Sequence, residues 1–276
     1  MLLALLLAVT PDAPPSWTQV LLYSLVPAAI MIVGAVVAVL RPPGAAIRSA
    51  ILHFAAGVVF SVVAVELLPD IVARHRPLEV GMGFAVGVGL MLALRSWTRK
   101  ASDKEKANPI PYFAPGTMWT SQTERAADQR QAPLPMGLLT GVAIDILIDG
   151  LLLGIGFAAG AEEGLLLAIA LTIEVLSLGL ATAVELQQEG QPKARTVGVV
   201  VALSGLLVVG AGVGITVLQG ASDNVMELVL SFGLAALLFL VTEELLTEAH
   251  EEPESPWLTS TFFLGFLVFL ILGMVV

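Results

Sequence analysis

Eight apolar segments of about 19–26 residues dominate the chain, and polar or proline-containing stretches separate them. An α-helix rises 1.5 Å per residue, so each segment is long enough to cross a hydrocarbon core of about 30 Å. Because lipid cannot pair with backbone N–H and C=O groups, each segment is expected to be a helix. The segments lie at 17–40, 49–69, 79–97, 134–159, 163–188, 195–219, 226–249 and 257–276. The sequence predicts an all-α polytopic membrane protein with one transmembrane domain over residues 1–276.

The composition excludes several kinds of site. Hydrophobic residues make up 57% of the chain and charged residues only 13%, against about 25% charged residues in soluble domains. Cysteine is absent and there are only three histidines, so disulfides and thiolate ligands are excluded. A histidine-rich zinc site is not expected, and His53 is interpreted as a packing residue at the membrane interface. Any bound metal would therefore be held mainly by oxygen.

Basic residues predict the orientation in the membrane. Eleven of the 13 Lys and Arg residues fall in or beside loops 1–2, 3–4 and 5–6, and only Arg74 and Arg76 fall on the other side. By the positive-inside rule, the eleven face the cytoplasm and both termini lie outside. Residues 98–133 form the one long loop, which is expected to be cytoplasmic and flexible. The protein is expected in the cytoplasmic (inner) membrane.

Acidic residues interrupt the fourth and fifth apolar segments near their middles. Asp145 and Asp149 are four residues apart and share a helix face, as do Glu174 and Ser177, three residues apart. A carboxylate at the bilayer centre costs about 2.5–3.5 kcal/mol, and such residues usually mark an ion or proton path. No Lys, Arg or His is expected at that depth to neutralise them. We therefore predict a metal site made of Asp145, Asp149, Glu174 and Ser177.

Further acids suggest a route to and from this site. Acidic openings concentrate cations. Two of these acids end the second apolar segment on the expected outer side, and three lie toward the cytoplasm on segments five and seven. The predicted pathway residues are Glu66, Asp70, Glu185, Glu243 and Glu244.

Two short stretches resemble each other. Val65 to Asp70 reads VELLPD and Glu243 to Glu248 reads EELLTE. They end segments two and seven, which cross the membrane in opposite directions. This is the relation that an inverted repeat of segments 1–3 and 6–8 predicts, with segments four and five at the centre.

The layout resembles the ZIP (Zrt/Irt-like) family of divalent metal transporters. Asp149-Gly150 is similar to the end of the family's fourth-span motif His-Asn-x-x-Glu/Asp-Gly, and Leu67-Leu68-Pro69-Asp70 is similar to its second-span pattern. The resemblance implies eight spans, outside termini and a 3+2+3 inverted arrangement with the metal site in spans four and five. The departures are Asp145, Ile146, Ser177 and Val208, which replace usual or occasional ligands, so one mononuclear site is expected.

The resulting hypothesis is a transporter that moves a divalent cation toward the cytoplasm by alternating access. Oxygen ligands favour Mn²⁺, Mg²⁺ or Fe²⁺, and Zn²⁺ also accepts carboxylates. The expected partners are the metal ion and the lipid bilayer, with no nucleic acid, no prosthetic group and no enzymatic reaction. A homodimer is one option for the oligomeric state. Two alternatives stay open: a proton-coupled carrier of small molecules, and a non-transporting ZIP-like protein whose acids are structural.

Overall fold

The computed structural model describes residues 16–107, 134–218, 220–250, 253 and 255–275, and within them every regular element is a helix. Two short π-helical elements, η1 and η3, interrupt longer α-helices. The elements are α2 (Trp17–Leu40), α3 (Ala45–Val62), η1 (Val63–Leu67), α4 (Leu68–Ala73), α5 (Pro77–Ala107), α7 (Met136–Ala159), α8 (Ala161–Gln188), α9 (Lys193–Leu218), α10 (Asp223–Phe239), η3 (Leu240–Leu245), α11 (Leu246–Ala249) and α12 (Pro256–Gly273).

These elements combine into eight spans. α3, η1 and α4 form one continuous helix, Ala45–Ala73, and α10, η3 and α11 form another, Asp223–Ala249. With α2, α5, α7, α8, α9 and α12 they give eight helices in the described chain that are long and apolar enough to cross a membrane. The prediction of an all-α polytopic membrane protein is confirmed.

The largest difference from the predicted boundaries lies after the third span. α5 continues to Ala107, whereas the sequence interpretation ended the third span at residue 97 and began the loop at 98. The stretch from Ala101 to Ala107 contains Ala, Lys and Glu, which favour helix, and no proline. The rest of the predicted loop, 108–133, lies outside the described residues, as do residues 1–15.

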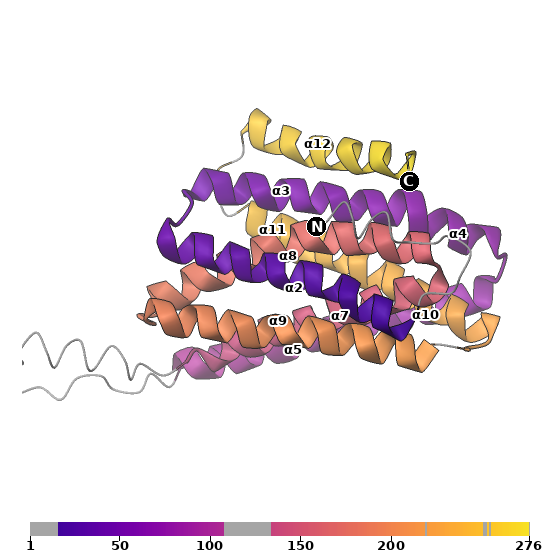
Figure 1. Ribbon diagram of the computed structural model, residues 1–276, viewed down its shortest axis with the longest axis horizontal. Helices are drawn as coiled ribbons and strands as arrows, with labels where there is room; N and C mark the ends of the chain where they lie inside the picture. The colour runs from indigo at the N-terminus through magenta and orange to yellow at the C-terminus, as the bar shows by residue number, and fades with distance from the viewer. Residues whose placement is uncertain (1–15, 108–133, 219, 251–252, 254, 276) are drawn as a thin grey trace, which may run out of the picture.

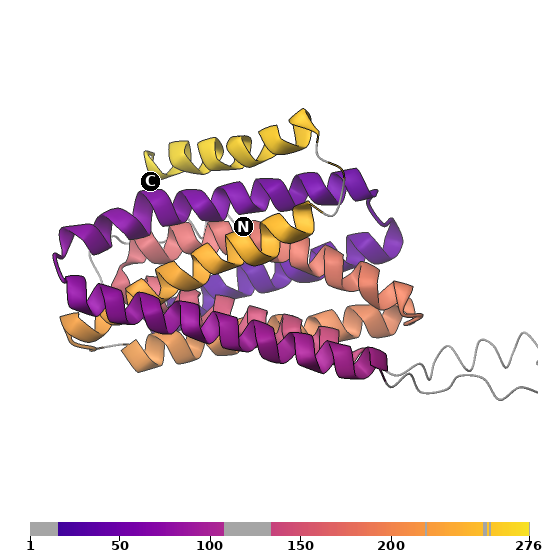
Figure 2. The same ribbon diagram turned by 180° about the vertical axis from the view of Figure 1, so that it is seen from behind.

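The main contacts between spans follow a repeated pattern, and one of them, between α12 and α3, lies at the edge of the bundle (Figures 1 and 2). The most extensive helix contacts are α7 with α9, α2 with α8, α12 with α3, and α10 with α5. Exchanging spans 1–3 with spans 6–8, and span four with span five, converts the α3–α12 contact into α10–α5 and the α2–α8 contact into α9–α7. The fold is therefore the 3+2+3 inverted repeat that the short sequence similarity predicts.

Glycines allow the closest of these contacts. A Cβ atom on Gly150 of α7 would lie 2.1 Å from the carbonyl oxygen of Leu207 on α9. A Cβ on Gly34 of α2 would lie 2.5 Å from the carbonyl oxygen of Leu176 on α8. Small residues let helix backbones approach in this way in membranes. α2, α7, α8 and α9 are therefore closely interlocked around the residues predicted to bind metal.

The two π-helical elements occupy corresponding places in the repeat. η1 lies in span two and contains Glu66, and η3 lies in span seven and contains Glu243 and Glu244. Single π-helical turns within α-helices are frequent at functional sites. The resemblance of VELLPD to EELLTE thus coincides with the same local departure from α-helix in two related spans.

Candidate functional site

The acids of spans four and five are buried side by side. Asp149 on α7 is 1% exposed and Glu174 on α8 is 2% exposed, while Asp145 is partly buried. Within the described chain, neither carboxylate oxygen of Asp149 has a hydrogen-bond partner, and Oε2 of Glu174 also lacks one. A buried carboxylate without a partner is costly, so this arrangement calls for a cation or a proton.

Span seven adds a fourth carboxyl group. Asp145 lies within hydrogen-bonding reach of Glu244 on η3. Asp149 interacts electrostatically with Glu174 and Glu244, and Glu174 with Asp145 and Glu244. The sequence interpretation placed Glu244 on the exit route, whereas the structure places it against the central acids. We refer to Asp145, Asp149, Glu174 and Glu244 as the central carboxyl group.

The contact between Asp145 and Glu244 requires either a proton or a cation between the two carboxyl groups. Two ionised carboxylates are both acceptors, so a hydrogen bond between them needs one proton. A metal ion could take the place of that proton, since a divalent cation can bind oxygen atoms of both groups. In the described part of the chain, no three His, Asp or Glu side chains converge closely enough to hold a metal ion. Metal binding would therefore draw the carboxyl groups inward.

One basic residue comes closer than the sequence predicts. Arg95 of α5 forms an ion pair with Glu243, and its charge also acts on Glu244. Arg95 acts on the acids of span seven, and it is not among the groups that interact electrostatically with Asp145, Asp149 or Glu174. The predicted third span ended at residue 97, so Arg95 was assigned to a loop edge, although a long arginine side chain can reach into a bundle.

Ser177 is buried beside Glu174, and its hydroxyl already has a partner. Its Oγ donates a hydrogen bond to the carbonyl oxygen of Glu174 at 2.5 Å, within α8. A serine that bonds back to its own helix in this way keeps oxygen lone pairs that can still accept. Ser177 could therefore contribute an oxygen to a cation, but only as a neutral ligand.

The acids predicted at the outer opening differ from one another. Glu66 lies near Glu162 and Glu163, at the start of α8, and interacts electrostatically with both. Asp70 instead accepts hydrogen bonds from Arg74, with 2.9 Å between Arg74 Nη2 and Asp70 Oδ2. Of the two predicted outer residues, Glu66 is thus the one surrounded by other acids.

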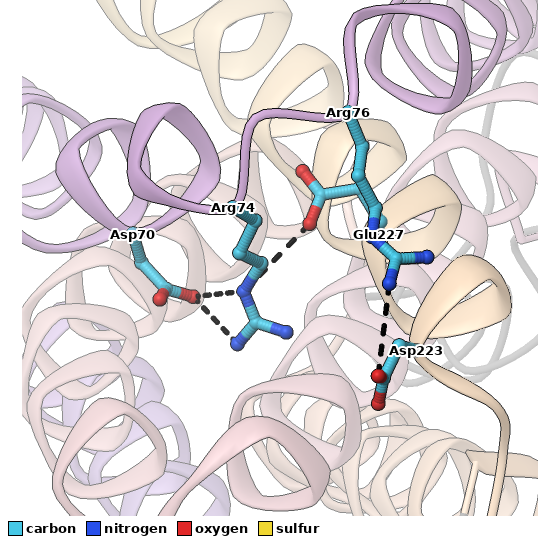
Figure 3. A network of polar contacts seen from close by, with 5 residues as sticks. All are labelled: Asp70, Arg74, Arg76, Asp223 and Glu227. Carbon is cyan, nitrogen blue, oxygen red and sulfur yellow. Dashed lines mark hydrogen bonds and ion pairs between the residues drawn. The ribbon is translucent and has the colours of Figure 1, made fainter.

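Asp70 belongs to a network that joins the end of span two and the loop after it to span seven (Figure 3). Glu227 of α10 is fully buried, and its Oε2 lies 3.7 Å from Arg74 Nε. Arg76 lies 3.7 Å from Asp223 across the same junction. The hydrogen bond that Arg74 donates to Asp70 raises the pKa of Arg74, so this guanidinium stays charged at any physiological pH. These five residues lie on the side that the basic residues predict to be outside, and we call them the outer ion-pair network.

Glu227 was not singled out from the sequence. It follows Asp223 by four residues, so the two share a helix face, and it lies within an apolar run. That spacing was the available signal. The remaining predicted pathway residue, Glu185, is exposed near the end of α8.

A family model described as ZIP Zinc transporter matches residues 98–274, which is more than half of the chain. The chain belongs to the ZIP family. The match covers spans four to eight and hence all four members of the central carboxyl group. Comparison with curated proteins gives no match. ZIP membership confirms the resemblance seen in the sequence, and it identifies the chain as a multi-pass member of a metal-transporter family.

Proposed function

We propose that this ZIP protein carries a divalent metal cation across the membrane toward the cytoplasm, and that the ion binds among Asp145, Asp149, Glu174 and Glu244. The observation that supports this most strongly is Asp149, which is 1% exposed with both carboxylate oxygens lacking a hydrogen-bond partner among the described residues. A divalent cation would balance the charge and fill the empty acceptor positions.

Binding would exchange water ligands for carboxylate oxygens. An ion arriving from the outer side would meet Glu66 with Glu162 and Glu163, whose charges raise its local concentration. It would then lose water as Asp149 and Glu174 turn toward it, with Ser177 as an additional neutral ligand. Any proton held between Asp145 and Glu244 would be displaced, as is usual when a metal binds protonatable ligands.

The attachment of the four acids to different spans supports alternating access. Asp145, Asp149 and Glu174 belong to the interlocked helices α7 and α8, whereas Glu244 belongs to span seven. Movement of α2, α7, α8 and α9 against the other four spans would change the distance from Glu244 to the remaining ligands. The number of ligands, and with it the affinity, would then depend on the position of the bundle.

Release would take place past Glu244 toward Glu185. Glu243 was also predicted on this route, but its ion pair with Arg95 leaves it less able to attract a cation. The oxygen ligands favour Mn²⁺, Fe²⁺ or Mg²⁺, and Zn²⁺ is also compatible with carboxylates.

Uptake into proteoliposomes tests the proposal. Asp149→Asn and Glu174→Gln keep the side-chain shapes and remove the charges, and both should abolish uptake of the transported ion. Glu189→Gln is the matched control, because Glu189 is an exposed carboxylate that follows the end of α8. If no divalent ion binds or moves, or if the two central variants transport like wild type, the proposal fails. Loss of stability without any change in flux would instead support purely structural acids.

A proton-coupled carrier of small molecules is the second candidate, and the approach of Asp145 to within hydrogen-bonding reach of Glu244 favours it, because a hydrogen bond between two carboxyl groups requires a proton. The two candidates differ in their response to chelators. Substrate-dependent proton movement that persists after all divalent ions are removed would favour the second candidate. Proton release that occurs only when a divalent ion is added would favour metal transport.

A further inference from the structure

Two of the three histidines lie together, away from the central carboxyl group. The rings of His53 on α3 and His250 after α11 have centroids 5.1 Å apart and planes inclined by 58°. The two residues are almost 200 positions apart in the sequence, and they sit at the end of the bundle predicted to face the cytoplasm. We propose that they form a two-imidazole binding site for a borderline divalent cation such as Zn²⁺ or Co²⁺.

Backbone contacts orient both rings for this role. Nδ1 of His53 lies 2.9 Å from the carbonyl oxygen of Ser49, and Nδ1 of His250 lies 2.5 Å from that of Leu246. A carbonyl oxygen only accepts, so each Nδ1 must donate a hydrogen. In a neutral ring the lone pair is then on Nε2. Metal-binding histidines commonly donate their other ring N–H to a carbonyl in this way.

The separation of the rings suits a shared ion. With metal–nitrogen bonds of about 2.0–2.1 Å and a tetrahedral angle, two ligating imidazoles have centroids about 5 Å apart. The observed 5.1 Å agrees with this value. The His250 side chain takes part in at least one further interaction, so an ion would exchange with an existing partner there rather than enter an empty position.

The pair is held in place and remains accessible. Ser49 Oγ donates a hydrogen bond of 2.8 Å to the carbonyl oxygen of Ala249, which joins α3 to the residue before His250. His53 is 5% exposed, whereas His250 is exposed. An ion can therefore approach from the His250 side, and water can complete its coordination. This site would supply nitrogen ligands, in contrast to the all-oxygen central carboxyl group.

The binding of an ion here does not depend on transport. Only its position relative to the path rests on the proposed function: the pair would hold an ion on the side where transport ends. The composition makes the nitrogen signal unusually easy to assign, because the chain has three histidines and no cysteine.

The test is X-ray absorption spectroscopy of the purified full-length protein loaded with Zn²⁺ and carrying an affinity tag without histidine. We expect imidazole scattering in wild type and in Asp149→Asn, and its loss in His53→Gln and His250→Gln. His250 is exposed, so His250→Gln should fold even if the buried His53 variant does not. His75→Asn is the matched control, because asparagine tolerates the positive φ of 54° at His75.

The proposal is overturned if wild type shows no imidazole scattering, if His250→Gln retains it, or if His75→Asn removes it. Failure of metal uptake in Asp149→Asn with retained imidazole scattering would leave this proposal standing and support the central site separately. Normal uptake in all variants together with loss of scattering in His250→Gln would support the histidine pair and contradict the proposed function instead.

Discussion

In the outer ion-pair network a buried acid lies beside a basic residue, whereas in the central carboxyl group a buried acid lies among other acids. Glu227 is 0% exposed and Asp149 is 1% exposed. Glu227 has a guanidinium 3.7 Å away, on Arg74. Asp149 interacts with other carboxyl groups, Glu174 and Glu244. A buried acid with a fixed cation can serve structure alone, whereas acids grouped without one require a cation or proton that can come and go.

The largest expected effect separates the two regions by function. Asp149→Asn should reduce metal uptake by about 100-fold or more, since a charged ligand contributes roughly 1.5–3 kcal/mol per interaction and Asp149 offers two oxygens. Its unfolding temperature should rise, because the substitution relieves repulsion among buried carboxyl groups. Glu227→Gln should retain uptake within about threefold. Uptake and thermal unfolding in detergent are the measurements, and equal loss of uptake in both variants would remove the distinction.

The neighbouring acids of η3 give a finer comparison. Glu244→Gln should weaken metal binding about 10- to 100-fold, as expected for losing one charged ligand. Glu243→Gln should change it by no more than about threefold, because Arg95 already pairs with Glu243 and partly exposed pairs contribute about 0–1 kcal/mol. Equilibrium binding of the transported ion to both purified variants decides this. A larger effect of Glu243→Gln would contradict the placement of Glu244, rather than Glu243, in the central carboxyl group.

Replacing Arg74, the fixed cation of the outer ion-pair network, should lower the free energy of unfolding. Arg74→Met leaves Glu227 buried without its ion-pair partner. Breaking a buried pair costs about 3–5 kcal/mol, and because the Arg74 side chain is 32% exposed, we expect about 1–3 kcal/mol. The double variant Arg74→Met with Glu227→Gln should recover much of the loss, since it removes the stranded charge. Chemical unfolding of the single and double variants provides the cycle, and strictly additive losses would contradict the coupling.

The smallest expected effect is the response of the two regions to pH. The pKa of Arg74 is raised in the folded protein, so its contribution to stability is fully present below the unfolded pKa and is lost only as the pH rises through the higher folded pKa, far above the physiological range. Between pH 6 and 9, this contribution should not change. Metal affinity at the central carboxyl group should fall on acidification, because protons compete for the same oxygens. Titrations of unfolding and of metal binding over this range test both statements.

Much of the fold is contained in length and hydrophobicity. Eight apolar runs predict eight helices without further information, and the spacing of Asp145 and Asp149 places them on one face of α7. The end of α5 was not predicted. The polar stretch after the apolar span is rich in helix-forming residues, so hydrophobicity shows where the span ends but not how far the helix continues beyond it. The arginine at position 95 was assigned to a loop edge for the same reason.

The sequence alone could not predict that Glu244 belongs to the central carboxyl group. Adjacent residues in a helix point about 100° apart, so only one of Glu243 and Glu244 can face a given neighbour. The π-helical element η3 changes the rotation at these very positions, and periodicity that assumes 3.6 residues per turn cannot choose between them. Contacts between distant spans decide the matter, and a single sequence does not contain them explicitly.

The two π-helical elements have a consequence for sequence comparison. Each accommodates one residue more than the α-helix that it interrupts. Deleting one residue from Leu240–Leu245 would restore a continuous α-helix and leave the residues after it on the faces that they now occupy. His250 would then stay beside His53, and α10 would keep its place. An alignment of this chain with a relative whose seventh span is uninterrupted α-helix should therefore open a one-residue gap within Leu240–Leu245.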